Sequence, residues 1–407
     1  MTDEDGLWNE AERPSAMFPV ALGSQSTAPL TNPIAKAPTF PANNPKEYNL
    51  KEDPMGIEFD PTIHLTSPLE IPQNIRILQL NEEAGTDCVK LVTMPTESYF
   101  NTRKKFTEDL AYTEPFRVLS DEGVKAFRSI IEHNEEEMAI VTPRNPKIIR
   151  GLGFTSKFVR DLNESPDLLH HLSRFANVDI AAHPMTTNYS QINFGEPPMG
   201  EEEAKPADVW HLDSVDYVLV IMLTDDFEGG ELLVSHIDPN QAMERIRTNT
   251  LPDELITKNK YPGPGYGIFM QGCRIAHAVA PLTAGSKSSR ITAVNSYASC
   301  DSMRIDRPSI YNALSQNHTK QVYDPDYLRL IAWRCMSKLN HLVTDPQYDN
   351  PRDGDDANNM DILDLVIDQL TMARALMGGE EKHKVPLSQN INLEQGGFHC
   401  AAEDQKL

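Results

Sequence analysis

Two histidines and one aspartate stand out in the sequence, because their types and spacing suit a metal ion. Trp210, His211, Leu212 and Asp213 form a short segment with strand-like surroundings. Residues two apart on a strand point to the same side, so an imidazole and a carboxylate can converge on one ion. His277 follows a second group of strand-like residues and is the candidate third ligand. We therefore predict a metal site made by His211, Asp213 and His277.

This ligand set also indicates the kind of metal chemistry. Two histidines and one carboxylate occupy one face of an Fe(II) ion and leave open positions for a bidentate 2-oxo acid and O₂, as in non-haem oxygenases. Zinc hydrolysis is the competing metal chemistry, but the sequence has no HExxH motif to supply its general base. The residues therefore favour oxidation at an Fe(II) centre.

Short strands separated by turns are expected around these three residues. Residues 217–223 form an apolar run rich in β-branched side chains, as in a buried strand. Acidic residues and glycines then mark a turn, and residues 231–235 resume as a strand. Further strand-like runs follow at 268–270 and 290–297. Several short strands with turn signals between them predict a barrel or a sandwich.

Taken in order, these segments resemble the 2-oxoglutarate- and Fe(II)-dependent dioxygenase superfamily, in its prolyl-hydroxylase-like branch. The resemblance runs from about residue 186 to residue 297 and is carried by the His-x-Asp segment and by the runs YVLVIMLTDDFEGGELLVS, GYGIFMQGCRIAHAVAPL and SSRITAVNSY. It implies an α+β protein with a double-stranded β-helix (jelly-roll) core and flanking helices. It also implies three cofactors or co-substrates, Fe(II), 2-oxoglutarate and O₂, with succinate and CO₂ as products.

The resemblance further implies a cationic anchor for the far carboxylate of 2-oxoglutarate. Arg290, with Thr292 beside it, matches the family's arginine position, and a guanidinium binds a carboxylate in a planar fork. Lys287 is the alternative anchor, because several relatives carry theirs at that place. Asn193 and Tyr189 are further candidates to bind 2-oxoglutarate or substrate, since alternating polar residues would share one strand face. The same alternation also fits an exposed face.

Amino-acid composition and the spacing of apolar residues divide the rest of the chain into segments. Residues 1–75 are rich in Pro, Asn, Thr and Ala without a period and predict an extended arm. We place the jelly-roll core with its N-terminal support helices at 76–320, a helical segment at 321–385 and a flexible tail at 386–407. Helix starts are predicted after Ser120, Ser156 and Ser165, and at Asp324 and Asp361. The last two helices carry these stripes: Leu328, Ala332, Cys335, Leu339 and Leu342, then Leu365, Gln369, Met372 and Leu376.

Composition narrows the partners and the compartment. A formal net charge of −23 should repel nucleic acid and anionic lipid. No run approaches the ~20 apolar residues of a membrane span, and the N-terminus lacks the pattern of a secretory signal. Five scattered cysteines without a Cys-x-x-Cys pair suit reduced thiols. We predict a cytoplasmic protein with a small-molecule substrate and no nucleic-acid or membrane partner. Its C-terminal helices either pack on the barrel or form a homodimer.

The predicted function is hydroxylation, desaturation or cyclisation at an unactivated C–H bond of a small metabolite, such as an amino acid or a natural-product intermediate. Two alternatives stay open, a protein hydroxylase of the prolyl or lysyl type and a jelly-roll binding protein with a dead metal site. The resemblance disfavours halogenation, because halogenating relatives replace the carboxylate ligand with a small residue and this chain keeps Asp213.

Overall fold

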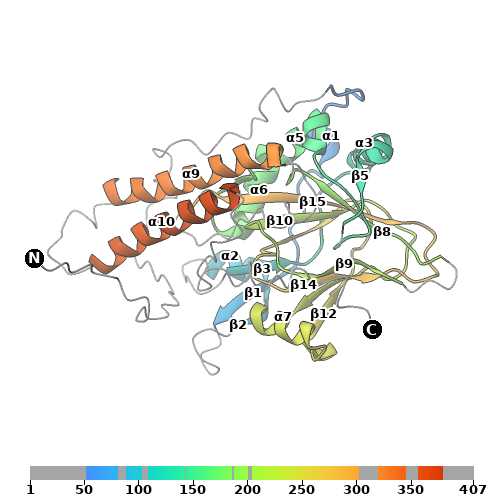
Figure 1. Cartoon of the computed structure of the whole chain (residues 1–407). Helices are drawn as coiled ribbons and strands as arrows, with labels where there is room; N and C mark the ends of the chain where they lie inside the picture. The colour runs from blue at the N-terminus through green and yellow to red at the C-terminus, as the bar shows by residue number, and fades with distance from the viewer. Residues whose placement is uncertain are drawn as a thin grey trace, which may run out of the picture.

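The computed structural model describes residues 52–80, 89–102, 109–142, 144–185, 188–199, 204–301, 320–344 and 356–378. Most of the predicted arm and all of the predicted tail lie outside these segments. Within them, two antiparallel sheets pack together, helices cover the larger sheet, and two long helices extend to one side (Figure 1). No helix among the described residues combines the length and hydropathy that crossing a membrane requires.

Eight strands form a jelly roll between the two sheets. The larger sheet places in order β13 (Tyr266–Met270), β10 (Tyr217–Met222), β15 (Arg290–Ser299) and β8 (Gln191–Gly195). The smaller sheet has the order β12 (Ile256–Asn259), β11 (Leu232–Ser235), β14 (His277–Pro281) and β9 (Pro206–His211). Along the chain the strands switch from one sheet to the other, except between β11 and β12. This is the α+β jelly-roll fold that the sequence predicts.

Strand β10 shows why its sequence is apolar at almost every position. Tyr217, Leu219 and Ile221 face the helices in one core cluster. Val218 and Met222 face the smaller sheet in another. A strand that is covered on both faces needs apolar side chains on both, so the usual alternation disappears.

The larger sheet extends beyond the jelly roll on both sides. Seven strands that the sequence did not predict contribute: β1 (Asn74–Leu80), β2 (Val89–Pro95), β3 (Asp109–Thr113), β4 (Phe116–Arg117), β5 (Ala139–Ile140), β6 (Lys147–Ile149) and β7 (Ile180–Ala182). Four of them have only two or three residues, too few for a period to be visible.

The larger helices on the outer face begin where the sequence predicts. Helix α3 (Asp121–Met138) follows Ser120, whose Oγ accepts a hydrogen bond from the Gly123 amide at 3.0 Å. Ser156 caps α5 (Lys157–Asn163) in the same way, and α6 (Pro166–Ala176) begins on its proline. Among the described residues, five further short helices are α1 (Pro61–His64), α2 (Thr96–Thr102), α4 (Leu152–Thr155), α7 (Pro239–Arg247) and the 3-10 helix η4 (Asp253–Leu255).

The C-terminal helices α9 (Lys320–Thr344) and α10 (Asp356–Gly378) form an antiparallel hairpin (Figure 1). Both begin earlier than Asp324 and Asp361, where the sequence predicted their starts. The hairpin core consists of Tyr327, Ile331, Cys335, Val366 and Ala373, together with Met185 from the body.

The predicted stripe on α9 is wrong in part. Leu328, Ala332 and Leu339 are exposed, and only Cys335 of the described stripe residues is buried. The side chain of Leu342 lies outside the described residues, as do those of Met372 and Leu376, whereas Leu365 and Gln369 are half-buried. The error has a physical cause, because α9 also buries the following polar residues, which a hydrophobic period cannot register: Arg334, Ser337 and Lys338.

Candidate metal centre and its cavity

The three predicted metal ligands meet at the edge between β9 and β14. These strands are neighbours in the smaller sheet, and His211 pairs directly with His277 in their register. Asp213 follows β9, and its backbone amide donates to the Gly272 carbonyl at 2.9 Å. One potential ligand atom from each residue lies within 4.8 Å of the other two. The local strand pattern therefore brings together side chains from two distant parts of the sequence.

Backbone hydrogen bonds orient both imidazoles toward Asp213. His211 Nδ1 lies 2.7 Å from the Val209 carbonyl, and His277 Nδ1 lies 3.0 Å from the Ile275 carbonyl. A carbonyl only accepts, so each Nδ1 carries the proton and each Nε2 keeps its lone pair for a ligand bond. The Nε2 atoms lie 3.4 Å and 3.7 Å from the Asp213 carboxylate.

The electrostatic surroundings of His277 and Asp213 favour the protonation states that metal binding requires. Burial, together with the neighbouring His211, lowers the pKa of His277 to about 4, so this imidazole is neutral near pH 7. Burial alone would raise the pKa of Asp213, but the adjacent imidazoles and the Arg144 guanidinium hold that pKa well below its usual range. Metal ligands must be neutral imidazoles and ionised carboxylates.

Two further observations show that these residues fit a divalent metal. Asp213 Oδ2 is buried and has no hydrogen-bond partner among the described residues, which is costly unless a cation neutralises it. Gly272 leaves space beside the carboxylate, since a Cβ there would lie 1.8 Å from Asp213 Oδ2 and 3.0 Å from His277 Cε1. The His₂Asp donor set suits Fe(II) among the first-row metals.

We expect Gly272→Ala to abolish metal binding, because the added methyl group would displace the Asp213 carboxylate. Gly263→Ala is the matched control, since a Cβ at Gly263 meets nothing within 4 Å. Isothermal titration with Mn(II) under anaerobic conditions measures the effect. A Gly272→Ala protein that bound Mn(II) as tightly as the parent would contradict the geometry of the site.

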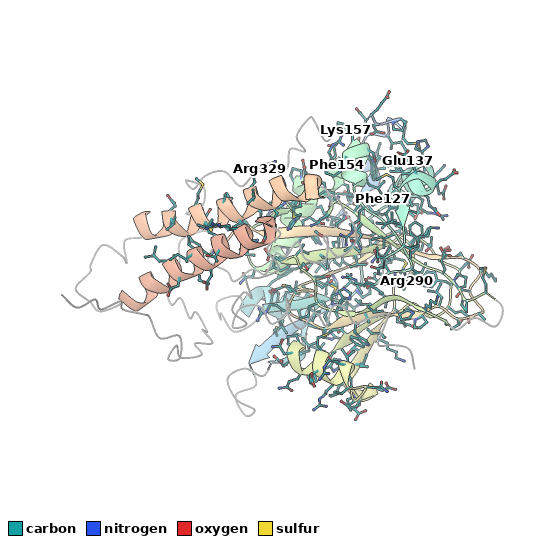
Figure 2. The ribbon with its side chains drawn as sticks, in the orientation of Figure 1. Phe127, Glu137, Phe154, Lys157, Arg290 and Arg329 are labelled. Atoms are coloured by element: carbon teal, nitrogen blue, oxygen red, sulfur yellow. The ribbon has the colours of Figure 1, made fainter. Side chains whose placement is uncertain are left out.

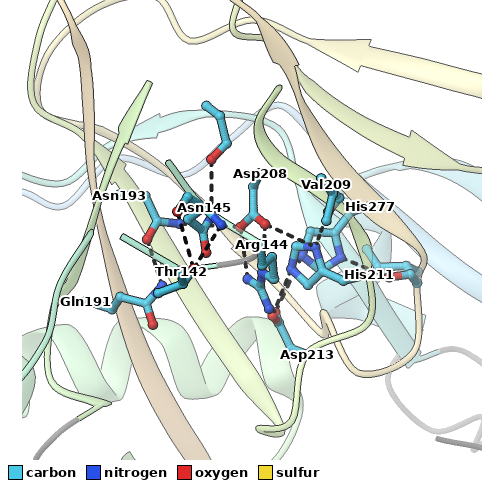
Figure 3. Close-up of polar contacts among 12 residues, drawn as sticks. Thr142, Arg144, Asn145, Gln191, Asn193, Asp208, Val209, His211, Asp213 and His277 are labelled. Atoms are coloured by element: carbon cyan, nitrogen blue, oxygen red, sulfur yellow. Dashed lines mark hydrogen bonds and ion pairs between the residues drawn. The ribbon is translucent and has the colours of Figure 1, made fainter. Parts of the chain in front are cut away.

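An ion pair between the half-buried Arg144 and the buried Asp208 lies beside the metal ligands and was not predicted from the sequence. Arg144 Nε and Nη2 donate to the two oxygens of Asp208 at 2.7 Å and 2.9 Å (Figure 3). Asp208 also lies 3.7 Å from His211 Nδ1. Arg144 precedes β6, outside the jelly roll, so no local motif connects it with the His-x-Asp segment. The bidentate pair fixes the approach of the 144–149 segment to the metal ligands.

The metal ligands lie in a cavity of about 100 Å³ between the two sheets. Its polar wall includes Arg290, Thr292 and Asn193, and its apolar wall includes Val218 and Val279. Arg290 lies among the jelly-roll strands in Figure 2 and is 1% exposed. Its Nε donates to the Gly230 carbonyl at 2.9 Å, and its Nη1 donates to Thr292 Oγ1 at 3.2 Å.

The Arg290 guanidinium has no carboxylate within ion-pair distance among the described residues. Burial lowers the pKa of Arg290, yet an arginine keeps its proton in proteins. Gly230 permits the close approach of this side chain, because a Cβ there would lie 2.7 Å from Arg290 Cδ. The cavity thus contains a buried cation that lacks a counter-ion among the described residues.

The other sequence candidates divide between the cavity and elsewhere. Asn193 lines the cavity, with its Oδ1 accepting from Gln191 at 2.7 Å. Lys287 is exposed and does not line it. The expectation that Tyr189 shares the inward face is wrong, because its ring lies in the core beneath the helices and its hydroxyl donates to Glu164 at 3.1 Å. Tyr189 lies before β8 begins at Gln191, so the alternation of side chains along that strand does not apply to it.

Comparisons with known proteins give distant similarities only. No protein-family profile and no curated protein matches the sequence. Similar solved structures include the non-heme alpha-ketoglutarate-dependent carbocyclase SnoK from nogalamycin biosynthesis (18% identity, 50% of this chain, 85% of that chain, TM-score 0.36). A second is EctD from S. alaskensis with bound Fe (14% identity, 51% of this chain, 79% of that chain, TM-score 0.36). A third is a Pseudomonas putida prolyl-4-hydroxylase (12% identity, 46% of this chain, 91% of that chain, TM-score 0.32). At these TM-scores we rest no argument on the similarities.

Proposed function

We propose that this protein is a 2-oxoglutarate- and Fe(II)-dependent oxygenase that oxidises an unactivated C–H bond of a small metabolite. The observation that carries the proposal is the buried Arg290 guanidinium, which has no anionic partner among the described residues and lines the same cavity as His211, Asp213 and His277. A cation buried without a counter-ion is unfavourable. A dicarboxylate co-substrate that bridges the metal and Arg290 would remove that cost.

The protein's residues take separate roles in this reaction. His211, Asp213 and His277 hold Fe(II), which when bound supplies the activation of O₂. Arg290 and Thr292 bind the far carboxylate of 2-oxoglutarate, and Asn193 orients the co-substrate or the substrate. One oxygen atom enters succinate as CO₂ leaves, and the other enters the substrate as a hydroxyl group.

Anaerobic addition of Fe(II) and 2-oxoglutarate tests the proposal. We expect a weak visible charge-transfer band that needs both components, and slow succinate formation once O₂ is admitted. A jelly-roll binding protein with a dead site gives neither signal, and a zinc hydrolase gives no succinate. Binding of Fe(II) without any 2-oxoglutarate-dependent signal would contradict the proposal.

A small metabolite is the proposed substrate class because the cavity has a volume of only about 100 Å³ and combines apolar walls with a few polar groups. An amino acid or a natural-product intermediate fits such a site. Screening a metabolite library for succinate formation coupled to substrate loss identifies the compound. Turnover of a prolyl or lysyl peptide with none of the metabolites would favour the protein hydroxylase instead. The cytoplasmic location and the absence of nucleic-acid and membrane partners stay predictions.

We also propose that the α9–α10 hairpin pairs two copies of this chain. Six large apolar side chains on it are exposed: Leu328, Met336, Leu339, Leu363, Ile367 and Leu370. Five of them directly follow a buried residue, and Leu370 follows the half-buried Gln369. In an antiparallel helix pair this one-residue offset turns both rows to the same side. The two rows are about 17 Å and about 11 Å long at 1.5 Å per residue, so the apolar face covers roughly 300 Å², and an interface of ~800 Å² per partner needs neighbouring residues of the hairpin as well.

We expect the double substitution Leu363→Lys and Ile367→Lys to produce a monomer, because two ammonium groups cannot be buried in an apolar helix interface. Asp364→Lys is the matched control, since it places a lysine on the same helix outside the apolar row. Light scattering at micromolar concentration measures the mass of each protein. A monomeric parent protein, or a dimer that survives both lysines, would eliminate this interface.

A further inference from the structure

The loop between β9 and β10 carries one metal ligand and depends on its surroundings for its position. It runs from residue 212 to residue 216 and contains Asp213. The Asp213 amide donates to the Gly272 carbonyl, but its Oδ2 has no hydrogen-bond partner among the described residues. Apart from the contact of its other oxygen with His211 Nε2 at 3.4 Å, the position of this carboxylate depends on where the loop backbone lies.

The other end of the loop is held by Asp216. Asp216 Oδ2 accepts hydrogen bonds from the Ser299 amide and from Arg334 Nη2, both at 2.8 Å. The Asp216 carbonyl accepts from the Cys273 thiol at 3.5 Å. Ser299 and Cys273 belong to the jelly roll, whereas Arg334 lies on α9, 118 residues further along the chain. A helix outside the jelly roll thus contributes the only ionic contact that is described for this aspartate.

The ion pair between Asp216 and Arg334 is buried on both sides. The Arg334 side chain is 1% exposed and that of Asp216 is 9% exposed. Removing one partner of such a pair leaves an uncompensated buried charge, which is strongly unfavourable. The β9–β10 loop can relieve this cost by moving Asp216 toward solvent, and that movement would carry Asp213 with it.

A second contact connects the hairpin with the cavity. Met185 lines the cavity, and the same side chain packs in the hairpin core with Tyr327, Ile331 and Cys335. The hairpin therefore supports the cavity wall as well as the ligand loop. These two contacts are independent, because one is ionic and the other is apolar.

We infer that the C-terminal hairpin belongs to the catalytic unit and that Arg334 is a positioning residue for the metal ligand Asp213. This inference rests on the proposed function, since it takes His211, Asp213 and His277 as the metal ligands. The alternative role for Arg334 is simply to dock the hairpin on the body. The two roles differ in their effect on metal affinity, because docking alone changes the stability of the hairpin and leaves the metal site intact.

Co(II) titration of the full chain separates the two roles without relying on turnover. Co(II) stands in for Fe(II), and its visible absorption reports the geometry of the site. For Arg334→Met we expect Co(II) affinity to fall roughly ten- to a hundred-fold, as for other residues that position metal ligands, with an altered visible spectrum. Arg334→Lys keeps the charge and should recover part of the affinity. Circular dichroism measures thermal unfolding, and the titrations are done at a temperature at which every variant is folded.

Lys338→Met is the matched control. Lys338 lies on the same helix, one turn beyond Arg334, and is 3% exposed, but its Nζ has no hydrogen-bond partner among the described residues. The Lys338→Met substitution should change the stability of the hairpin without changing the affinity of the protein for Co(II). Parent-like affinity in both Arg334 variants, with faster proteolysis of the hairpin, would overturn the inference. An equal loss in Lys338→Met would overturn it too, whereas a parent protein that binds no Co(II) contradicts the proposed function itself.

Discussion

Asp213→Ala should abolish turnover and reduce metal affinity by a hundred-fold or more, while the metal-free protein keeps its fold. The variant loses the one carboxylate among the three ligands. Asp213 Oδ2 has no described hydrogen-bond partner to lose, so the metal-free variant should unfold at a midpoint similar to that of the metal-free parent. Metal at a hundred times its dissociation constant stabilises the parent by about 2.7 kcal/mol, and the same concentration should stabilise the variant by about 0.4 kcal/mol or less.

Thermal unfolding with and without Mn(II), together with 2-oxoglutarate consumption, measures both parts of this expectation. Asp225→Ala is the control, because Asp225 is an exposed acid in the turn after β10, away from the cavity. Its metal-dependent gain in midpoint should equal that of the parent. If Asp213→Ala consumed 2-oxoglutarate at the parent rate, His211, Asp213 and His277 would not be the metal site.

The parts of this site that the sequence predicts are those governed by strand geometry. His211 ends β9 and pairs in register with His277, so strand pairing brings the two histidines together. Asp213 is near enough in sequence to join them, although it lies in the loop after β9. The same alternation places Gln191 and Asn193 in the cavity, while Ile192 and Phe194 face the helices. These positions can be predicted from the sequence because they depend on the alternation of side chains along a strand and on the pairing of neighbouring strands.

The parts that the sequence did not predict depend on contacts between distant segments. Arg144 reaches Asp208 from a segment before β6, and Arg334 reaches Asp216 from α9. Nothing in the local sequence of Arg144 distinguishes it from a solvated surface residue. A buried ion pair interrupts the apolar period that identifies a helix face, and for this reason the face of α9 was assigned wrongly. A charged residue on the apolar side of an otherwise periodic helix is the signal that could have identified Arg334.

The effect of Arg290→Met on 2-oxoglutarate should be of similar size to that of Asp213→Ala on metal. Removing one member of a buried charge-assisted contact costs about 2–5 kcal/mol, so the 2-oxoglutarate dissociation constant should rise roughly thirty-fold or more. Lys287→Met should change it little, because Lys287 is exposed and outside the cavity. Titration of 2-oxoglutarate into the Mn(II)-loaded proteins measures both constants.

The Arg290 variant also separates loss of co-substrate from loss of fold. In the absence of 2-oxoglutarate, Arg290 is a buried cation without a described counter-ion, and methionine would replace it with an apolar side chain of similar length. Such replacements are often neutral or stabilising, so Arg290→Met should unfold no earlier than the parent and should bind Mn(II) normally. A protein of parent stability that has lost only its response to 2-oxoglutarate identifies Arg290 as the anchor. A large effect at Lys287 with none at Arg290 would move the anchor to the lysine and would leave the buried guanidinium unexplained.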